Sequence, residues 1–400
     1  MLFKYLTIAA ACLCGGPAGA VSWGTAVDNG IVLAPSGIVP NAGQGAAPFW
    51  GGNTVVDLVT SQITDYRIAT AVDNNLGSAH DVLPYLNGTG LLPSTYLYGG
   101  TTSTQLDISG SVNIDIAGYV GGTCGGGHCV DGPTHAALWT NAGTSFADLH
   151  PSGFVASLAQ AVDQYTDVVG WATDNGGLLH AMVLFGPHVG GGRELPRPTG
   201  FTQAAATAIA NSGESQASSR IGGYGTAANG QTHPIVWVSN GAGGYTATDV
   251  LPGNGVSGVI VAGDPLQFAI NKKTNAFGGS MITASTGGQY HAAIWYGPNW
   301  SDVVDLHPAK GNFTSSSVYA ERVLTDYTVE AGLAAKSKGR NTVWSAMVWR
   351  GTAGSAVNLG KKLPAGFSQS TATGIDNIGN IVGAALDASG VWHVVTWPIE

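Results

Sequence analysis

One short pattern returns along most of this chain and limits what the chain can fold into. Its clearest form runs from His135-Ala-Ala-Leu-Trp139 through Asp148-Leu-His-Pro151 to Gln160-Ala-Val-Asp163 and Val168-Val-Gly170. The tryptophan position returns roughly every 50 residues, with one longer interval between Trp50 and Trp139. A unit of this length cannot bury both of its faces alone, so neighbouring copies must stack on one another.

Each full copy contains four strand-like pieces, which are rich in Val, Ile, Trp or Ala and bounded by Gly, Asn, Asp or Ser. In the clearest copy they cover 157–163, 167–172, 180–185 and the residues near 193–195. No window shows convincing helical periodicity. Antiparallel four-stranded units arranged radially form a β-propeller, which leaves only short edges exposed. We therefore predict an all-β fold, a β-propeller of four-stranded antiparallel blades, with seven blades favoured and eight or six as alternatives.

The two ends of the chain are expected to meet in one blade. The last copy stops at Trp397-Pro-Ile-Glu400, without a fourth strand, and we expect Val21-Ser-Trp23 to supply it. Thr25-Ala-Val-Asp28 is interpreted as the first strand of the first copy, and Arg322-Val-Leu324 as the first strand of a later one. Residues 21–400 are thus predicted to form a single propeller domain.

The long interval between tryptophans has two interpretations. The favoured one is an insertion at about 74–110, between the first and second strands of the second copy. The alternative is a degenerate eighth copy with Tyr96-Leu-Tyr98 as its third strand, but the fourth strand of such a copy is missing.

The N-terminus is typical of a secretory signal peptide over residues 1–20. Lys4 is followed by an apolar run over 5–13 and by Ala18-Gly-Ala20, a small-residue cleavage site. A lipoprotein signal at Cys12 or Cys14 is the alternative, but neither cysteine has Leu three positions upstream. The run is far shorter than the ~20 residues that span a bilayer, and no later segment reaches that length. We predict a secreted, extracellular protein, with the periplasm or cell surface as alternatives, and no membrane span.

Composition limits the partners. Charged residues make up 10% of the chain, against about 25% in an ordinary soluble domain. The net charge is −9 and becomes one unit more negative when Lys4 is removed with the signal. A mildly acidic surface without a basic run argues against nucleic acid and anionic membranes as partners. No cofactor motif is present, and we expect a monomer that needs no cofactor.

The exported chain keeps two cysteines, Cys124 and Cys129, within Cys-Gly-Gly-Gly-His-Cys. In an oxidising compartment this spacing predicts a small disulfide loop. The alternative is a metal site that also draws on His128, Asp131 and His135. A zinc site usually has a second ligand pair with clear spacing, and none is visible, so no metal site is predicted.

Histidines, tryptophans and aspartates recur with the repeat, so we predict that they form the scaffold of each blade. The residues are His135, His180, His233, His291 and His393, then Trp139, Trp237, Trp295, Trp349 and Trp397, then Asp148 and Asp305. The tryptophans are expected to pack between blades. A ring of histidine ligands around a central channel is the functional alternative, but Ser345 and Ala46 interrupt it.

The motif Asp-x-His-Pro occurs twice, as Asp148 with His150 and as Asp305 with His307. An acid beside a histidine is suited to proton transfer. Residues i and i+2 of a strand share a face, however, so the pair equally suits a brace for the turn that the proline begins. Because the motif repeats, we favour the brace.

No catalytic residue is predicted, because no Gly-x-Ser-x-Gly, His-Glu-x-x-His or phosphate-binding loop is present. Only five glutamates are present, and their spacing in sequence does not show which acids could meet at a propeller axis: Glu194, Glu214, Glu321, Glu330 and Glu400. Four tryptophans outside the repeated position are candidates for an exposed platform that stacks on sugars, with core packing as the alternative: Trp171, Trp300, Trp344 and Trp392. Sequons at Asn87, Asn299 and Asn312 matter only in a eukaryotic host.

The order Ala-Val-Asp163, Val-Val-Gly170, His-Ala-x-x-Trp139 and Asp148-Leu resembles the extracellular HAF-repeat family of bacterial exported proteins. That family's pattern runs Ala-Ile-Asn, Val-Val-Gly, His-Ala-Phe-Leu-Trp, Asp-Leu-Gly. Two positions depart from it, since the Phe is replaced, for example by Ala137 or Met182, and the final Gly by His150 or His307. The resemblance implies an exported propeller-like repeat protein and carries no established catalytic residue.

Because binding groups tend to lie on loops over a rigid scaffold, we predict a binding protein for a glycan or another surface polymer or protein. The insertion at 74–110 and the Cys124–Cys129 loop are expected to mark the binding end of the ring. The alternatives are an extracellular polysaccharide hydrolase or lyase, whose carboxylates meet at the propeller axis, and a structural protein of the cell envelope.

Overall fold

The computed structural model describes residues 21–400 with the exception of 34–47, 52–53, 58–66, 73–80, 83–97, 100–115, 122–123, 126–127, 130–133, 141–144, 163–165, 187–191, 212–218, 242, 251–275, 283–286, 298–301, 325–326, 339–340, 376–378 and 391. The described residues form strands, apart from two short 3-10 turns, η4 (Ala353–Ser355) and η5 (Leu359–Lys362).

The strands pair into small sheets, most of which are built from consecutive strands. The sheets are β3 (Thr54–Asp57), β2 (Pro48–Gly51), β6 (Tyr98–Gly99) and β5 (Asp81–Val82); β11 (Ser145–Asp148), β10 (Thr134–Thr140), β7 (Ile116–Gly121) and β4 (Arg67–Val72); β12 (Ala156–Val162), β13 (Val168–Thr173), β14 (Leu179–Phe185) and β15 (Arg193–Glu194); β16 (Phe201–Asn211), β17 (Ser219–Ala227), β18 (Thr232–Ser239) and β19 (Tyr245–Asp249); β20 (Ala276–Met281), β21 (His291–Tyr296) and β22 (Asp302–Asp305); β23 (Ser315–Leu324), β24 (Tyr327–Lys338), β25 (Asn341–Trp349) and β26 (Val357–Asn358); and β1 (Val27–Leu33), β29 (Trp392–Trp397), β28 (Ile381–Asp387) and β27 (Phe367–Ile375). A separate hairpin joins β8 (Cys124–Gly125) to β9 (His128–Cys129).

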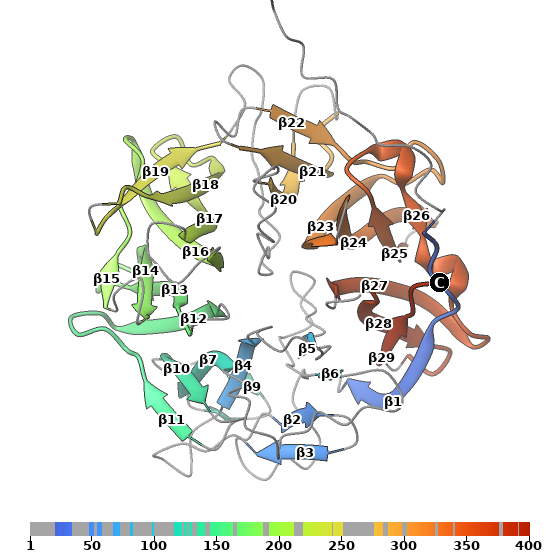
Figure 1. The fold of residues 1–400 in the computed structure, drawn as a ribbon, viewed down its shortest axis with the longest axis horizontal. Coiled ribbons are helices and arrows are strands. Elements are labelled where there is room, and N and C mark those ends of the chain that lie inside the picture. The colour runs from blue at the N-terminus through green and yellow to red at the C-terminus, as the bar shows by residue number, and fades with distance from the viewer. Residues whose placement is uncertain are drawn as a thin grey trace, which may run out of the picture.

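The sheets stand as blades around a central axis, with first strands such as β12, β16, β23 and β27 innermost (Figure 1). Fourth strands such as β15, β19 and β26 lie at the outer edge. The predicted all-β propeller of four-stranded antiparallel blades is confirmed. The number of blades stays a prediction, because the sheet β20–β22 has three strands among the described residues and 251–275 lies outside them.

Strands from both ends of the chain share one blade, although not with the residues that the sequence indicated. β1 pairs antiparallel with β29, Val27 lying opposite Thr396 and Leu33 opposite Trp392. Val27–Leu33 therefore forms the outer strand that Val21–Trp23 was expected to supply, and Thr25–Asp28 is not a first strand. Trp23 forms a single bridge to Ile399 and buries its indole, whose Nε1 donates a hydrogen bond to Gly379 O at 2.9 Å.

Two short strands come from the predicted insertion. β5 and β6 pair with each other, and Gly99 of β6 lies parallel and opposite Gly51 of β2. This segment thus contributes inner strands to the sheet whose other members are β2 and β3. The rest of 74–110 lies outside the described residues.

The glycine of Val-Val-Gly has a steric reason. Several first strands contain a β-bulge, for example between Ala159 and Ala161, and the glycine of the second strand faces it. A Cβ at Gly170 would lie 2.0 Å from the backbone oxygen of Leu158, and one at Gly383 would lie 1.9 Å from that of Thr371. Because the bulged backbone comes so close, the second strand requires glycine at this point.

The recurring tryptophans lie between blades. Trp237, Trp295, Trp349 and Trp397 are all fully buried. Trp237 packs with Val183 and Leu195 of the preceding blade, and its Nε1 donates to Pro196 O at 2.7 Å. The backbone of Trp139 lies in β10, and its side chain is outside the described residues.

Candidate functional site

Histidines that begin third strands lie at one end of the ring, which we call the histidine end. It is defined by His135, His180, His233, His291 and His393. Each Nδ1 contacts an acid of the fourth strand, at 2.9 Å for Asp148, 2.8 Å for Glu194, Asp249 and Asp305, and 3.1 Å for Asp28. The contact of His393 with Asp28 is consistent with the role of β1 as the outer strand of the last blade, because Asp28 takes the place of the fourth-strand acid. In the β23–β26 blade, Ser345 and Asn358 replace both members of the pair.

The Asp-x-His-Pro motif builds a closed hydrogen-bond network. Ala136 N donates to Ser157 Oγ at 2.8 Å, and the same oxygen lies 2.9 Å from His150 Nδ1. At the other side of the ring, His150 Nε2 donates to Phe154 O at 3.1 Å. Burial, followed by the neighbouring His135, lowers the pKa of His150.

A second copy of this network centres on His307. It contacts Ser316 Oγ at 2.8 Å and Phe313 O at 3.2 Å, and it stacks on His291 at 3.9 Å between ring centroids. Burial and the neighbouring His291 lower its pKa as well. Because Ser157 and Ser316 are buried and their hydroxyls are engaged, these contacts suit a brace between blades and offer no nucleophile to a substrate.

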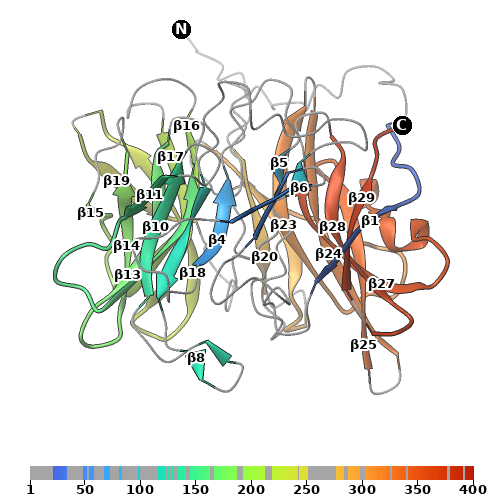
Figure 2. The ribbon, with the colours of Figure 1, turned by 90° about the horizontal axis from the view of Figure 1, so that it is seen from below.

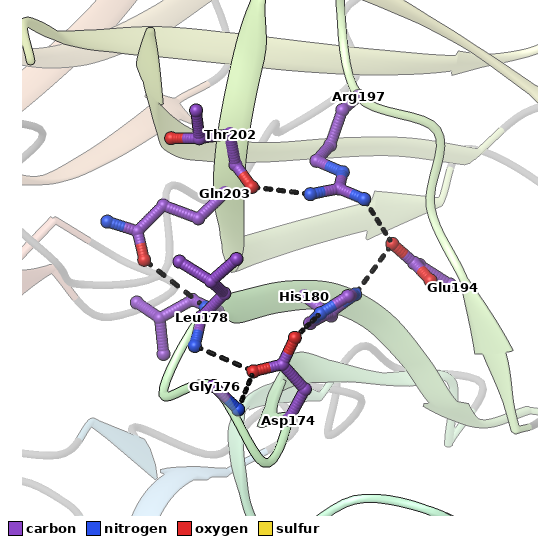
Figure 3. Close-up of polar contacts among 9 residues, drawn as sticks. Asp174, Gly176, Leu178, His180, Glu194, Arg197, Thr202 and Gln203 are labelled. Atoms are coloured by element: carbon purple, nitrogen blue, oxygen red, sulfur yellow. Dashed lines mark hydrogen bonds and ion pairs between the residues drawn. The ribbon is translucent and has the colours of Figure 1, made fainter. Parts of the chain in front are cut away.

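His180 lies between two carboxylates (Figure 3). Its Nε2 is 3.2 Å from Asp174 and its Nδ1 is 2.8 Å from Glu194, which also lies 3.6 Å from Arg197. Asp174 accepts the backbone N–H groups of Gly176 and Leu178 at 2.8 and 2.9 Å. The pKa of Asp174 is lowered mainly by the hydrogen bond from Leu178 N, and further by the hydrogen bond with His180.

Side chains of one blade also bind the backbone of the blade before it. Gln203 Oε1 accepts Leu179 N at 3.2 Å, and Gln369 Oε1 accepts Trp344 N at 3.1 Å. Ser370 Oγ accepts Ala346 N at 3.0 Å in the same junction. These contacts join neighbouring blades at the histidine end, so side chains beside them stand on a rigid support.

Apolar and aromatic side chains reach the surface at the histidine end. Val155, Leu178 and Tyr290 are 45%, 41% and 37% exposed, and Trp344 is half-buried. Tyr290 and Trp344 occupy the same position in their copies, directly before the histidine or the serine that replaces it. We call these four residues the rim. Trp171 is half-buried too, whereas Trp300 and the side chain of Trp392 lie outside the described residues.

The strongest break in the repeat is a buried pair of glutamates. Glu321 of β23 lies directly opposite Glu330 of β24, and their exposures are 4% and 0%. Aliphatic residues hold this position in other blades, as Val162 opposite Val168 or Ile209 opposite Ile221. Burial, then the charge of Glu330, raises the pKa of Glu321 well above its ordinary value, and burial raises that of Glu330 to about 7.

The contribution of the glutamate pair to the stability of the protein should therefore fall as pH rises. The folded chain keeps the Glu330 proton up to pH about 7, whereas an unfolded chain loses it near 4.5, so the stabilisation is complete below 4.5 and is lost through 7. Glu330 alone should lower the free energy of unfolding by about 3 kcal/mol across this window. Urea unfolding in the presence of EDTA, repeated at several pH values, measures how steeply the free energy of unfolding falls with pH. This slope should be flatter in Glu330→Gln than in the wild type. Asp302→Asn, at an exposed site, should keep the original slope; equal slopes in all three proteins contradict the prediction.

The insertion at 74–110 and the Cys124–Cys129 loop, which were expected to mark one binding end of the ring, connect at opposite ends of β7. The segment 73–115 enters β7 at Ile116, whereas the β8–β9 hairpin follows Gly121. Figure 2 shows β8 projecting from one end of the ring. The segment and the hairpin thus connect to β7 at opposite ends of the strand; whether both mark one binding end stays a prediction, because most of 74–110 lies outside the described residues.

The cysteines themselves face each other, Cys124 lying opposite Cys129 across the β8–β9 hairpin. Their side chains are outside the described residues, as is Asp131 of the alternative metal site, so the disulfide stays a prediction. Among the described residues, no three or more His, Cys, Asp or Glu gather to hold a metal. Asn312 is exposed, whereas Asn87 and Asn299 lie outside the described residues.

Comparison with known proteins does not identify a family for this chain. No protein-family model matches the sequence, and no curated protein matches it. Among solved structures, the chain is similar to Trypanosoma rangeli sialidase at 7% identity and a TM-score of 0.30. The match covers 90% of this chain and 49% of the sialidase chain, so this chain spans about half the length of that protein. No helix of the described residues is long and apolar enough to cross a membrane. The class that remains is a β-propeller repeat protein.

Proposed function

We propose that this chain is a secreted β-propeller binding protein that recognises a glycan through the histidine end of the ring, with another surface polymer or a protein as the alternative ligand. The observation that carries the proposal is the rim, where Tyr290 and Trp344 offer aromatic surface at equivalent positions. Binding sites combine such apolar surface with a few fixed polar groups. Here those groups are the acids held by the histidines, of which Asp305 contacts His291, the residue that follows Tyr290.

A glycan array followed by pull-down on the polysaccharides that bind tests this proposal. Tyr290→Ala and Trp344→Ala should each weaken binding by about tenfold or more, because an aromatic contact at the centre of an interface often supplies over 1 kcal/mol. Phe185→Ala is the matched control, since Phe185 is 39% exposed at the other end of its blade. Equal binding by all four proteins, or binding to a protein only, would remove the glycan from the proposal.

A hydrolase or lyase is the second candidate, because Glu321 and Glu330 lie side by side. Both carboxyls are buried, and an acid pair that cleaves a glycoside must contact the sugar on either side of the bond. Release of reducing ends from the polysaccharides that bind would favour the enzyme. Binding without release of reducing ends would favour the binding protein. Absence of both binding and release would favour a structural role in the cell envelope.

Export and the disulfide belong to the same proposal, as does membership of the HAF-repeat family, whose His-Ala-x-x-Trp motif corresponds to third strands such as β10 and β21. The secreted protein is expected to begin at Val21 and to lack two hydrogens relative to its reduced mass. Intact mass spectrometry before and after reduction measures both. An unchanged mass on reduction would contradict the disulfide, and a lipid-sized mass increase would favour the lipoprotein alternative.

A further inference from the structure

The glutamate pair faces one particular neighbour. Ala320, Val329 and Ala331 pack toward the last blade, in a core that includes Ile375 and Trp397. Because side chains of a strand alternate between faces, Glu321 and Glu330 face the opposite way, toward the β20–β22 blade. On that side, Ala334 and Trp349 pack with Ala276 and Ile294. The pair thus lies inside a junction between blades.

Three polar atoms in this row have no hydrogen-bond partner among the described residues. They are Glu321 Oε2, Glu330 Oε1 and the Nε1 of Trp349, which lies opposite Glu330 in the neighbouring strand. The other oxygen of Glu330 accepts Gly351 N at 2.8 Å. Buried polar groups in native proteins nearly always have a hydrogen-bond partner. Three unpaired polar atoms in one row therefore indicate that a polar ligand or an ion binds between them.

The rest of the repeat shows that the fold itself does not need these acids. Ile375 opposite Ile381 fills the same position in the last blade, and Ile209 opposite Ile221 fills it in the β16–β19 blade. An aliphatic pair satisfies the packing, whereas a buried carboxyl without a compensating charge is costly. The acids are explained if an ion of opposite charge lies between them.

We propose that Glu321 and Glu330 bind a divalent cation, with calcium the best match, between the β20–β22 and β23–β26 blades. Two carboxylates bring the two negative charges that a divalent ion needs, and their oxygens are the ligands that calcium prefers. Bidentate binding supplies up to four oxygens, and water supplies the others. The Trp349 N–H is placed in the same row, where it suits hydrogen bonding to such a water.

The test compares the wild type with Glu321→Gln and with the double variant Glu321→Ile plus Glu330→Ile, after EDTA treatment and dialysis. Calcium, magnesium and manganese chloride are added separately at pH 8, and thermal unfolding and titration calorimetry are recorded. Calcium should raise the unfolding temperature of the wild type by several degrees and bind at one equivalent. Both variants should lose this response. At pH 5 the wild-type response should shrink, because protons compete for the carboxylates.

The double variant keeps the test decisive, because it restores the aliphatic pair of the other blades and is expected to fold. Circular dichroism checks its fold, and Asp302→Asn should keep the wild-type response. The proposal is overturned if no cation changes the unfolding temperature, or if the double variant responds like the wild type. It is also overturned if the pair responds to pH alone, which assigns the site to a shared proton. Glycan binding is a separate readout, so failure here leaves the proposed function untouched.

Discussion

Replacing Gly383 with alanine is expected to lower the free energy of unfolding by about 3 kcal/mol, as backbone must move to admit the new atom. The Cβ would lie 1.9 Å from Thr371 O and 2.9 Å from the Cα of Ala372, which are backbone atoms of the innermost strand. No rotamer change relieves such a contact. The bulge between Ala372 and Gly374 would have to flatten, and with it the fit of β27 against the neighbouring blade.

Urea unfolding of the purified variant measures this effect. Gly354→Ala is the matched control, because nothing lies within 4 Å of its Cβ position and its φ is not positive. The control should change stability by no more than about 0.5 kcal/mol. Gly223→Ala, with a Cβ 2.1 Å from Ala205 O, should repeat the large loss in a different blade. Similar stabilities of Gly383→Ala and Gly354→Ala would contradict the steric explanation.

Local patterns were enough to predict the blades. The third strand His291–Tyr296, for example, begins at a histidine after a glycine turn, and its four central residues are buried on both faces of the sheet. Spacing then placed the remaining strands, because every copy needs the same partners at nearly the same separations. The spacing also distinguishes Trp344, which is half-buried, from four tryptophans at the repeated position, which are fully buried: Trp237, Trp295, Trp349 and Trp397.

Ring closure was harder to predict, since it depends on residues at opposite ends of the chain. Thr25-Ala-Val-Asp28 has the same local character as Gln160-Ala-Val-Asp163, so it was assigned to a first strand. Its partner is His393, and no local pattern contains that contact. Likewise, the insertion and the Cys124–Cys129 loop are neighbours in sequence, yet β7 separates them because they connect to its opposite ends.

The glutamate pair was missed through a shift in alignment. Assigning Arg322–Leu324 to the first strand hid that Ala320-Glu321 corresponds to Ala161-Val162, where an aliphatic residue is expected. The bulge between Val318 and Ala320 marks the correct register, but a bulge adds a residue that a simple spacing rule does not include. Glu321 and Glu330 lie opposite each other only because the hairpin between β23 and β24 has a particular length. The correct register of β23 would have shown that the two glutamates are paired.

Replacing Trp237 with alanine is expected to cost about 3–5 kcal/mol, the range for truncating a fully buried tryptophan. Its indole fills the junction between two blades, in contact with Val183 and Leu195 on one side and Ile221 on the other. The substitution leaves a cavity there and leaves Pro196 O without its 2.7 Å donor. Because a ring is closed, neither blade can move inward to fill the cavity without opening another junction.

Urea unfolding again gives the magnitude, with Phe185→Ala as the control for loss of an exposed aromatic side chain. A third variant, Trp237→Leu, imitates the copy in which Leu184 holds this position and should recover part of the loss. Native-state hydrogen exchange adds the location, since opening should be faster in β14 and β18, which flank the cavity, than in β28. Uniform acceleration over all blades would instead mean that the ring opens as one cooperative unit.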